Sequence, residues 1–136
     1  MTKLLIEKLL NNEKRSGIIN VGSEPAHFIY KNCPIYSATK AYITKFSECL
    51  GADYSEKIDV LTASVGSTKT RLNPAVEVLS STPESVAKHT LDCLGWDSHT
   101  FGDSKHGVRN YYLKRPIEGA VIRYVDAKRH QALPQE

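Results

Sequence analysis

The chain has 136 residues, and we expect residues 1–136 to form a single domain. Hydrophobic residues make up 40% of the chain and charged residues 24%, a globular composition that argues against disordered, collagen-like and low-complexity proteins. The net charge of +3 is mild and indicates no nucleic-acid partner, and no apolar run approaches the roughly 20 residues of a membrane span.

The cysteines and the first residues indicate the compartment. Cys33, Cys49 and Cys93 lie far apart without a C-x-x-C pair, which favours free thiols in a reducing compartment. Residues 1–7 carry a charge after three apolar residues, unlike a secretory signal. We therefore expect an intracellular protein, cytoplasmic or associated with the endoplasmic reticulum, with no transmembrane segment in this chain.

The first third of the chain predicts a helix, a strand and a long helix. Leucines at helical spacing predict a helix over residues 3–13. The apolar run Ile18–Val21, bounded by two glycines, is typical of a buried strand. A polar loop over residues 23–32 follows. Pro34 suits the first position of a helix that we expect to run to about Tyr54.

A second buried strand is predicted over Ile58–Val65. Strand, helix and strand then form a βαβ unit, which requires parallel strands. The sequence Thr-Pro-Glu at residues 82–84 predicts the start of a helix that ends at Gly95. Val108–Leu113 is predicted as a strand, and Pro116 as the start of a last helix. The expected fold is α/β: a partial, Rossmann-like, doubly wound parallel sheet with a β-α-β-α core and flanking helices.

A tyrosine and a lysine one helical turn apart are the main candidates for chemistry. Tyr36 and Lys40 share one helix face, and a nearby ammonium favours the phenolate form of a tyrosine. Such a phenol can give a proton to a carbonyl oxygen as a hydride arrives, or remove one in reverse. Ser23 follows the preceding strand, where open α/β sheets bind ligands, and its hydroxyl can stabilise charge on the same oxygen.

The spacing of this pair is not specific by itself. Tyr124 and Lys128 have the same spacing without a strand, a loop and a helix around them. On spacing alone, Tyr36 and Lys40 are equally well interpreted as a pair on an exposed helix surface.

Three motifs in order add specificity: Asn20-Val-Gly-Ser23, Tyr36-Ser-Ala-Thr-Lys40 and Val65-Gly-Ser-Thr-Lys-Thr70. Together they resemble the C-terminal half of the short-chain dehydrogenase/reductase family, over about residues 1–95. Within the family, the 3-oxoacyl-CoA reductase and 17β-hydroxysteroid dehydrogenase branch is the most similar. The resemblance implies an NAD(P)(H)-dependent oxidoreductase that interconverts ketones and secondary alcohols, with a 3-oxoacyl-CoA or a steroid as substrate.

The resemblance also implies roles for individual residues. Tyr36 corresponds to the catalytic acid and base, Ser23 to the serine that orients the substrate, and Lys40 to the lysine that tunes the tyrosine and holds the nicotinamide ribose. Gly66 and Thr70 correspond to the glycine and threonine of the turn beside the nicotinamide. The implied cofactor is NADP or NAD, bound by Tyr36, Lys40, Gly66 and Thr70.

Some family features are missing. No T-G-x-x-x-G-x-G or G-x-G-x-x-G motif, the turn that holds the pyrophosphate, occurs in the 136 residues. Val65 replaces a proline, and Gly22 replaces the first serine of a pair. Alternatives to an active enzyme are therefore a truncated sequence and a non-catalytic remnant that serves as a structural subunit of a larger assembly. We expect a homo-oligomer or another chain to cover the exposed sheet edge.

Two further patterns carry less weight. His89-x-x-x-Cys93, with His99 and His106 downstream, lacks the spacing of a known metal site, so we expect surface or core roles and no metal. The basic residues around the last predicted helix can lie on an anionic membrane surface, but they are better interpreted as a solvated helix face.

Overall fold

The computed structural model describes residues 2–74, 79–114, 120, 123–124 and 127. Its elements, in chain order, are α1 (Thr2–Leu10), β1 (Ser16–Val21), the 3₁₀ turn η1 (Glu24–Ala26), α2 (Pro34–Asp53), β2 (Ile58–Ala63), α3 (Pro83–Cys93), β3 (His99–Thr100) and α4 (Ser104–Leu113).

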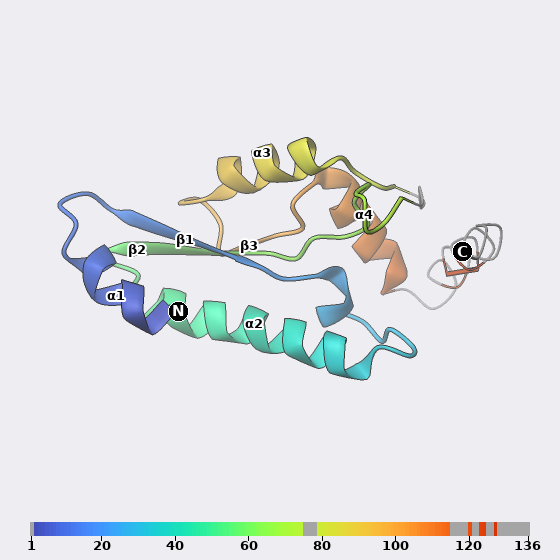
Figure 1. Ribbon diagram of the computed structural model, residues 1–136, viewed down its shortest axis with the longest axis horizontal. Helices are drawn as coiled ribbons and strands as arrows, with labels where there is room; N and C mark the ends of the chain where they lie inside the picture. Colours follow the sequence, from blue (N-terminus) through green and yellow to red (C-terminus); the bar gives the residue numbers. More distant parts are fainter. Residues whose placement is uncertain (1, 75–78, 115–119, 121–122, 125–126, 128–136) are drawn as a thin grey trace.

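The strands form a parallel sheet in the order β1-β2-β3, and helices cover both of its faces. Figure 1 shows α1 and α2 on one face, α3 on the other, and α4 near the end of the sheet where β1 and β2 finish. β1 pairs with β2 along its whole length, from Ser16 opposite Ile58 to Val21 opposite Ala63. The predicted βαβ unit and the α/β class are confirmed.

A small apolar core holds α1 and α2 against the strands. Leu50 of α2 packs with Ile58 and Val60 of β2, and all three side chains are buried. Around them lie the partly buried side chains of Ile6, Leu9, Leu10, Ile18 and Tyr54. Since a fully buried aliphatic side chain contributes roughly 1.5–3 kcal/mol, this cluster is what keeps the long helix on the sheet.

Local start and stop signals place two helices where the sequence predicts them. α2 begins at Pro34 and ends one residue before Tyr54. At the start of α3, the Thr82 hydroxyl accepts the N–H of Ser85 at 3.3 Å, and Gly95 beyond its end has a φ of +88°. α1 is shorter than predicted and ends at Leu10.

The prediction of a strand over residues 108–113 is wrong, because these residues form the second half of α4. The buried face of this helix is largely polar, with Arg109 and Asn110 inside, while Val108 and Tyr111 are exposed. Because the inward-facing residues are polar, the apolar residues of this segment do not recur at helical spacing, and the helix could not be predicted from hydropathy. The helix predicted to start at Pro116 lies largely outside the described residues. No helix in the described part of the chain is both long and apolar enough to span a membrane.

The start of α4 is fixed by Asp103. Its carboxylate accepts the N–H of Lys105 at 2.8 Å and the hydroxyl of Ser85 at 2.5 Å, which ties α4 to α3. Burial raises the pKa of the Asp103 carboxyl, but these hydrogen bonds outweigh burial, and the pKa lies below its ordinary value.

We predict that Asp103→Ala lowers the free energy of unfolding by about 1–2 kcal/mol, because it removes a helix cap and a link between helices. Urea denaturation measures the change, with the exposed Ser104→Ala as control. Because folding lowers the pKa of Asp103, its contribution is complete above the pKa of the unfolded carboxyl and is lost as pH falls through the folded pKa. Equal stability of the two variants at neutral pH would contradict this role.

Candidate active site

The carboxyl ends of β1 and β2 meet at one edge of the sheet, and their pairing continues beyond the strands. The N–H of Gly22 donates to the carbonyl of Ala63 at 2.8 Å, and the N–H of Glu24 donates to the carbonyl of Val65 at 3.1 Å. Ser23 lies between these two bonds, so its position relative to the end of β2 is fixed. Ligands of open α/β sheets bind at this edge.

A pocket of about 380 Å³ opens at the same edge. It brings together Ser23 after β1, Tyr36 in the first turn of α2 and Gly66 after β2, as predicted for one site. Lys40 and Thr70 do not line it. The complete lining is Ser23, Glu24, Pro25, Phe28, Tyr30, Cys33, Tyr36, Val65, Gly66, Ser67, Asn73 and Arg109.

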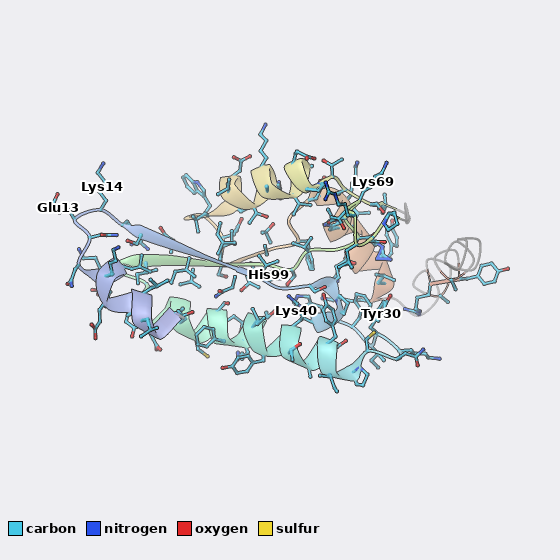
Figure 2. All side chains as sticks on the ribbon, in the orientation of Figure 1. Glu13, Lys14, Tyr30, Lys40, Lys69 and His99 are labelled. Carbon is cyan, nitrogen blue, oxygen red and sulfur yellow. The ribbon has the colours of Figure 1, made fainter. Side chains whose placement is uncertain are left out.

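Lys40 lies between the tyrosine ring and the end of β1. Its Nζ is 5.8 Å from the centre of the Tyr36 ring and donates a hydrogen bond of 3.0 Å to the carbonyl of Val21. Figure 2 labels Lys40 beside the first half of α2, on the side toward the strands. The Tyr36 side chain is 47% exposed. A positive charge is therefore held beside a phenol that a ligand in the pocket can reach.

The hydroxyls of Ser23 and Thr70 both form hydrogen bonds with the backbone. The buried Ser23 hydroxyl donates to the carbonyl of Val65 at 3.4 Å, a long bond that a substrate oxygen can replace. Thr70 is exposed, and its hydroxyl accepts the N–H of Asn73 at 3.1 Å. Because Asn73 lines the pocket, Thr70 supports the rim and does not reach the interior.

Gly66 packs closely against two side chains. A Cβ at this position would lie less than 3.0 Å from the Glu24 carboxylate and from the His106 ring. The N–H of Gly66 donates to Nδ1 of His106 at 3.2 Å, and Nε2 of His106 lies 2.8 Å from the carbonyl of Ser67. Nδ1 of His106 also lies 3.1 Å from the carbonyl of Phe101, so backbone groups of three residues surround the ring. This glycine is therefore required by packing, whatever else it binds.

Sequence reasoning missed a buried ion pair in the pocket wall. Nη1 of Arg109 lies 3.0 Å from Oε2 of Glu24, and the two side chains are only 7% and 2% exposed. The pair connects η1 with α4 across 85 residues. No local pattern reveals such a pair, although an acid directly after a strand end was a weak signal.

We predict that Arg109→Met lowers the free energy of unfolding by about 3–5 kcal/mol, because it removes the cation from a buried carboxylate. Glu24→Gln combined with Arg109→Met should cost less than the sum of the single changes. Lys45→Met is the matched control. It breaks the exposed Lys45–Glu48 pair of 2.8 Å, which contributes at most about 1 kcal/mol. Urea denaturation measures the loss of free energy of unfolding in each variant. A similar loss for Arg109→Met and Lys45→Met would contradict the claim that burial makes the Arg109–Glu24 pair costly to break.

Residues 1–78, more than half of the chain, match the family described as short chain dehydrogenase. The chain belongs to this family. The resemblance of the three motifs to this family is thereby confirmed.

Named relatives cover most of this chain but are much longer. "Putative steroid dehydrogenase 4" of Caenorhabditis elegans is 29% identical over 88% of this chain and 47% of its own length. Human 17-beta-hydroxysteroid dehydrogenase type 3 is 29% identical over 83% of this chain and 37% of its own length. The very-long-chain 3-oxoacyl-CoA reductase of Bos taurus is 30% identical over 79% and 35%. The chain thus spans less than half the length of these relatives.

A solved structure gives the same result for the fold. A chain from a study of 7β-hydroxysteroid dehydrogenase stereoselectivity aligns with a TM-score of 0.59 over 92% of this chain and 50% of its own length. The two sequences are 21% identical, so this likeness concerns the fold alone. The partial Rossmann-like architecture is confirmed.

Proposed function

We propose that this chain carries the proton-transfer half of an NAD(P)(H)-dependent oxidoreductase that interconverts ketones and secondary alcohols. The observation that carries the proposal is the shared pocket of Ser23 and Tyr36, with the Lys40 ammonium beside the tyrosine ring. Membership of the short chain dehydrogenase family supports the reaction class.

Each of the three side chains has a distinct role. The Tyr36 phenol gives its proton to the carbonyl oxygen as a hydride reaches the carbonyl carbon, and takes it back in the reverse reaction. The Ser23 hydroxyl donates a hydrogen bond to the same oxygen and stabilises its developing negative charge. The Lys40 ammonium stabilises the phenolate that remains on Tyr36.

The residues at this edge fit the nicotinamide end of NAD or NADP, which supplies or accepts the hydride. Lys40 and Tyr36 offer an ammonium and a hydroxyl for the ribose oxygens, and Gly66 lines the same pocket as Tyr36. Thr70 at the rim is proposed to contact the same end. The 136 residues contain no glycine-rich turn for the pyrophosphate, so we propose full activity only for a protein with the remaining part of the family fold.

The pocket lining supports an apolar substrate. Phe28, Tyr30 and Tyr36 supply three aromatic rings, an apolar surface on which an acyl chain or a steroid can pack. Steroid dehydrogenase and 3-oxoacyl-CoA reductase are the names of relatives. We propose a steroid ketone or a 3-oxoacyl thioester as the substrate class.

The sheet edge supports a partner chain. β1 is an outer strand, and among the described residues only β2 pairs with it. Val21, at its end, is 59% exposed. We propose that a second copy or another chain covers this edge. The same observation favours the second candidate function, a non-catalytic structural subunit.

The free cysteines are the basis for a proposed cellular location. All three cysteines are free in the structure, which supports a reducing, intracellular compartment, either the cytoplasm or the surface of the endoplasmic reticulum.

The catalytic proposal predicts that the chain binds NADPH or NADH weakly, in the millimolar range, as seen by cofactor fluorescence or calorimetry. It also predicts that Tyr36→Phe lowers any ketone reduction by about 100-fold or more, because the acid that protonates the carbonyl oxygen is removed. Tyr42→Phe is the matched control, since Tyr42 is 70% exposed on the same helix and stacks on Phe46.

Two outcomes decide between the candidate functions. Cofactor binding with activity that is lost in Tyr36→Phe and kept in Tyr42→Phe supports the oxidoreductase. No binding at millimolar cofactor, or equal activity in both variants, defeats it and leaves the structural subunit.

A further inference from the structure

Two histidines from distant segments meet at Ser64, beside the segment that carries Ser23. His27 directly follows η1, Ser64 follows β2 and His99 begins β3. The two Nε2 atoms lie 3.3 Å apart, and the Ser64 oxygen lies 2.8 Å from Nε2 of His27 and 3.0 Å from Nε2 of His99. Figure 2 labels His99 between the strands and α2. These contacts connect the loop after β1 to β2 and β3.

The sheet holds two members of this cluster, and the third lies in a connecting segment. The N–H of Ser64 donates to the carbonyl of Thr100 at 2.8 Å, and His99 is paired with β2 as part of β3. His27 lies in residues 23–28, most of which line the candidate active-site pocket. If the contacts of His27 break, it is therefore this segment that can move, while the strands stay paired.

The number of hydrogens in the cluster decides whether its contacts are favourable. When one Nε2 carries a hydrogen, that ring donates it, and the Ser64 hydroxyl donates to the lone pair of the other Nε2. A hydrogen on both Nε2 atoms leaves the Ser64 hydroxyl without an acceptor in the cluster and directs two N–H groups at each other across 3.3 Å. Because Ser64 is fully buried, water does not replace the lost acceptor.

We propose that His27, Ser64 and His99 form a pH-sensitive switch that controls the position of residues 23–28. The switch is closed, with His27 against Ser64 and His99, while only one Nε2 carries a hydrogen. It opens when both nitrogens carry one, and residues 23–28 then separate from β2 and β3. Because this segment contributes Ser23 to the pocket, the pocket changes shape as the solution becomes acidic. The switch is a property of the fold and does not depend on the proposed reaction.

The surroundings of the two rings favour the closed, neutral state. Burial lowers the pKa of both His27 and His99, and the charge of His99 lowers the pKa of His27 further. The Phe101 ring contributes to this burial, since it contacts both imidazoles edge-on. Two charged groups face the rings: the Glu48 carboxylate on α2 raises both pKa values, and the Lys114 ammonium after α4 lowers them. The net change is downward for both rings.

The direction of these pKa changes fixes the pH range of the switch. Between the lowered pKa values of the folded chain and the ordinary histidine value of 6.5, the folded chain binds fewer protons than the unfolded chain. The contribution of the closed cluster to stability is therefore complete above pH 6.5 and is lost as the pH falls through the folded pKa values. Opening is expected on the acid side of neutrality.

The test is backbone hydrogen exchange of the full chain at pH 7 and pH 5, corrected for the intrinsic pH dependence of exchange. The amide of His27 donates to the carbonyl of Glu24 at 2.9 Å, and we expect its protection to fall by about tenfold or more at pH 5. The amide of Val86 in α3, which donates to the carbonyl of Thr82 at 3.1 Å, should lose less protection, because α3 stays folded when the switch opens.

Glutamine variants show whether the histidines cause the change. Glutamine donates and accepts hydrogen bonds but does not titrate. The double variant His27→Gln with His99→Gln should therefore remove the fall in protection at residue 27. The matched control His89→Gln replaces an exposed histidine of α3 and should show the same fall as the unmodified chain.

A measurement on the unmodified chain tests the switch even if the double variant fails to fold. Nitrogen-15 spectra of the histidine rings should show one hydrogen shared by the two Nε2 atoms at pH 7, and the second should bind only below pH 6.5. Hydrogens on both Nε2 atoms at pH 7 would overturn the proposal. So would an equal loss of protection at His27 and Val86, or a fall in protection that survives in the double variant.

Discussion

The parallel hydrogen bonds between β1 and β2 join two segments 42 residues apart and leave α2 as the connection between them. Each strand contributes six residues, and two further bonds extend the pairing to Glu24 and Val65. Because the strands are parallel, both carboxyl ends lie at the edge where α2 begins. Tyr36 and Lys40 share one face of α2, and the strand pairing places Ser23 in the same pocket as Tyr36.

The pocket wall depends on packing that tolerates little change. Gly66 has no side chain where a Cβ would collide with Glu24 and His106, and Glu24 is held by Arg109 from α4. A buried ion pair is costly to break, even where it adds little net stability over an apolar pair. The shape of the pocket wall therefore depends on α4, which contains none of the three family motifs. The ion pair therefore couples the position of the Ser23 segment to the stability of α4.

The sequence predicted those features that have local signals. Pro34 and the Thr82 cap marked helix starts, and short apolar runs marked β1 and β2, so the βαβ unit was predicted correctly. α4 was mistaken for a strand because its buried face carries Arg109 and Asn110, which hydropathy counts as exposed. The Glu24–Arg109 pair and the contact between His27 and His99 span 85 and 72 residues, so only the tertiary fold reveals them.

The most direct test of this account is the register of β1 against β2 in the full chain, measured by nuclear Overhauser contacts between backbone protons. The account predicts contacts of a parallel pair with Ile18 opposite Val60, together with slow exchange of the Gly22 amide that donates to Ala63. Antiparallel contacts, a shifted register or a rapidly exchanging Gly22 amide would contradict it, because Ser23 would then no longer face the start of α2.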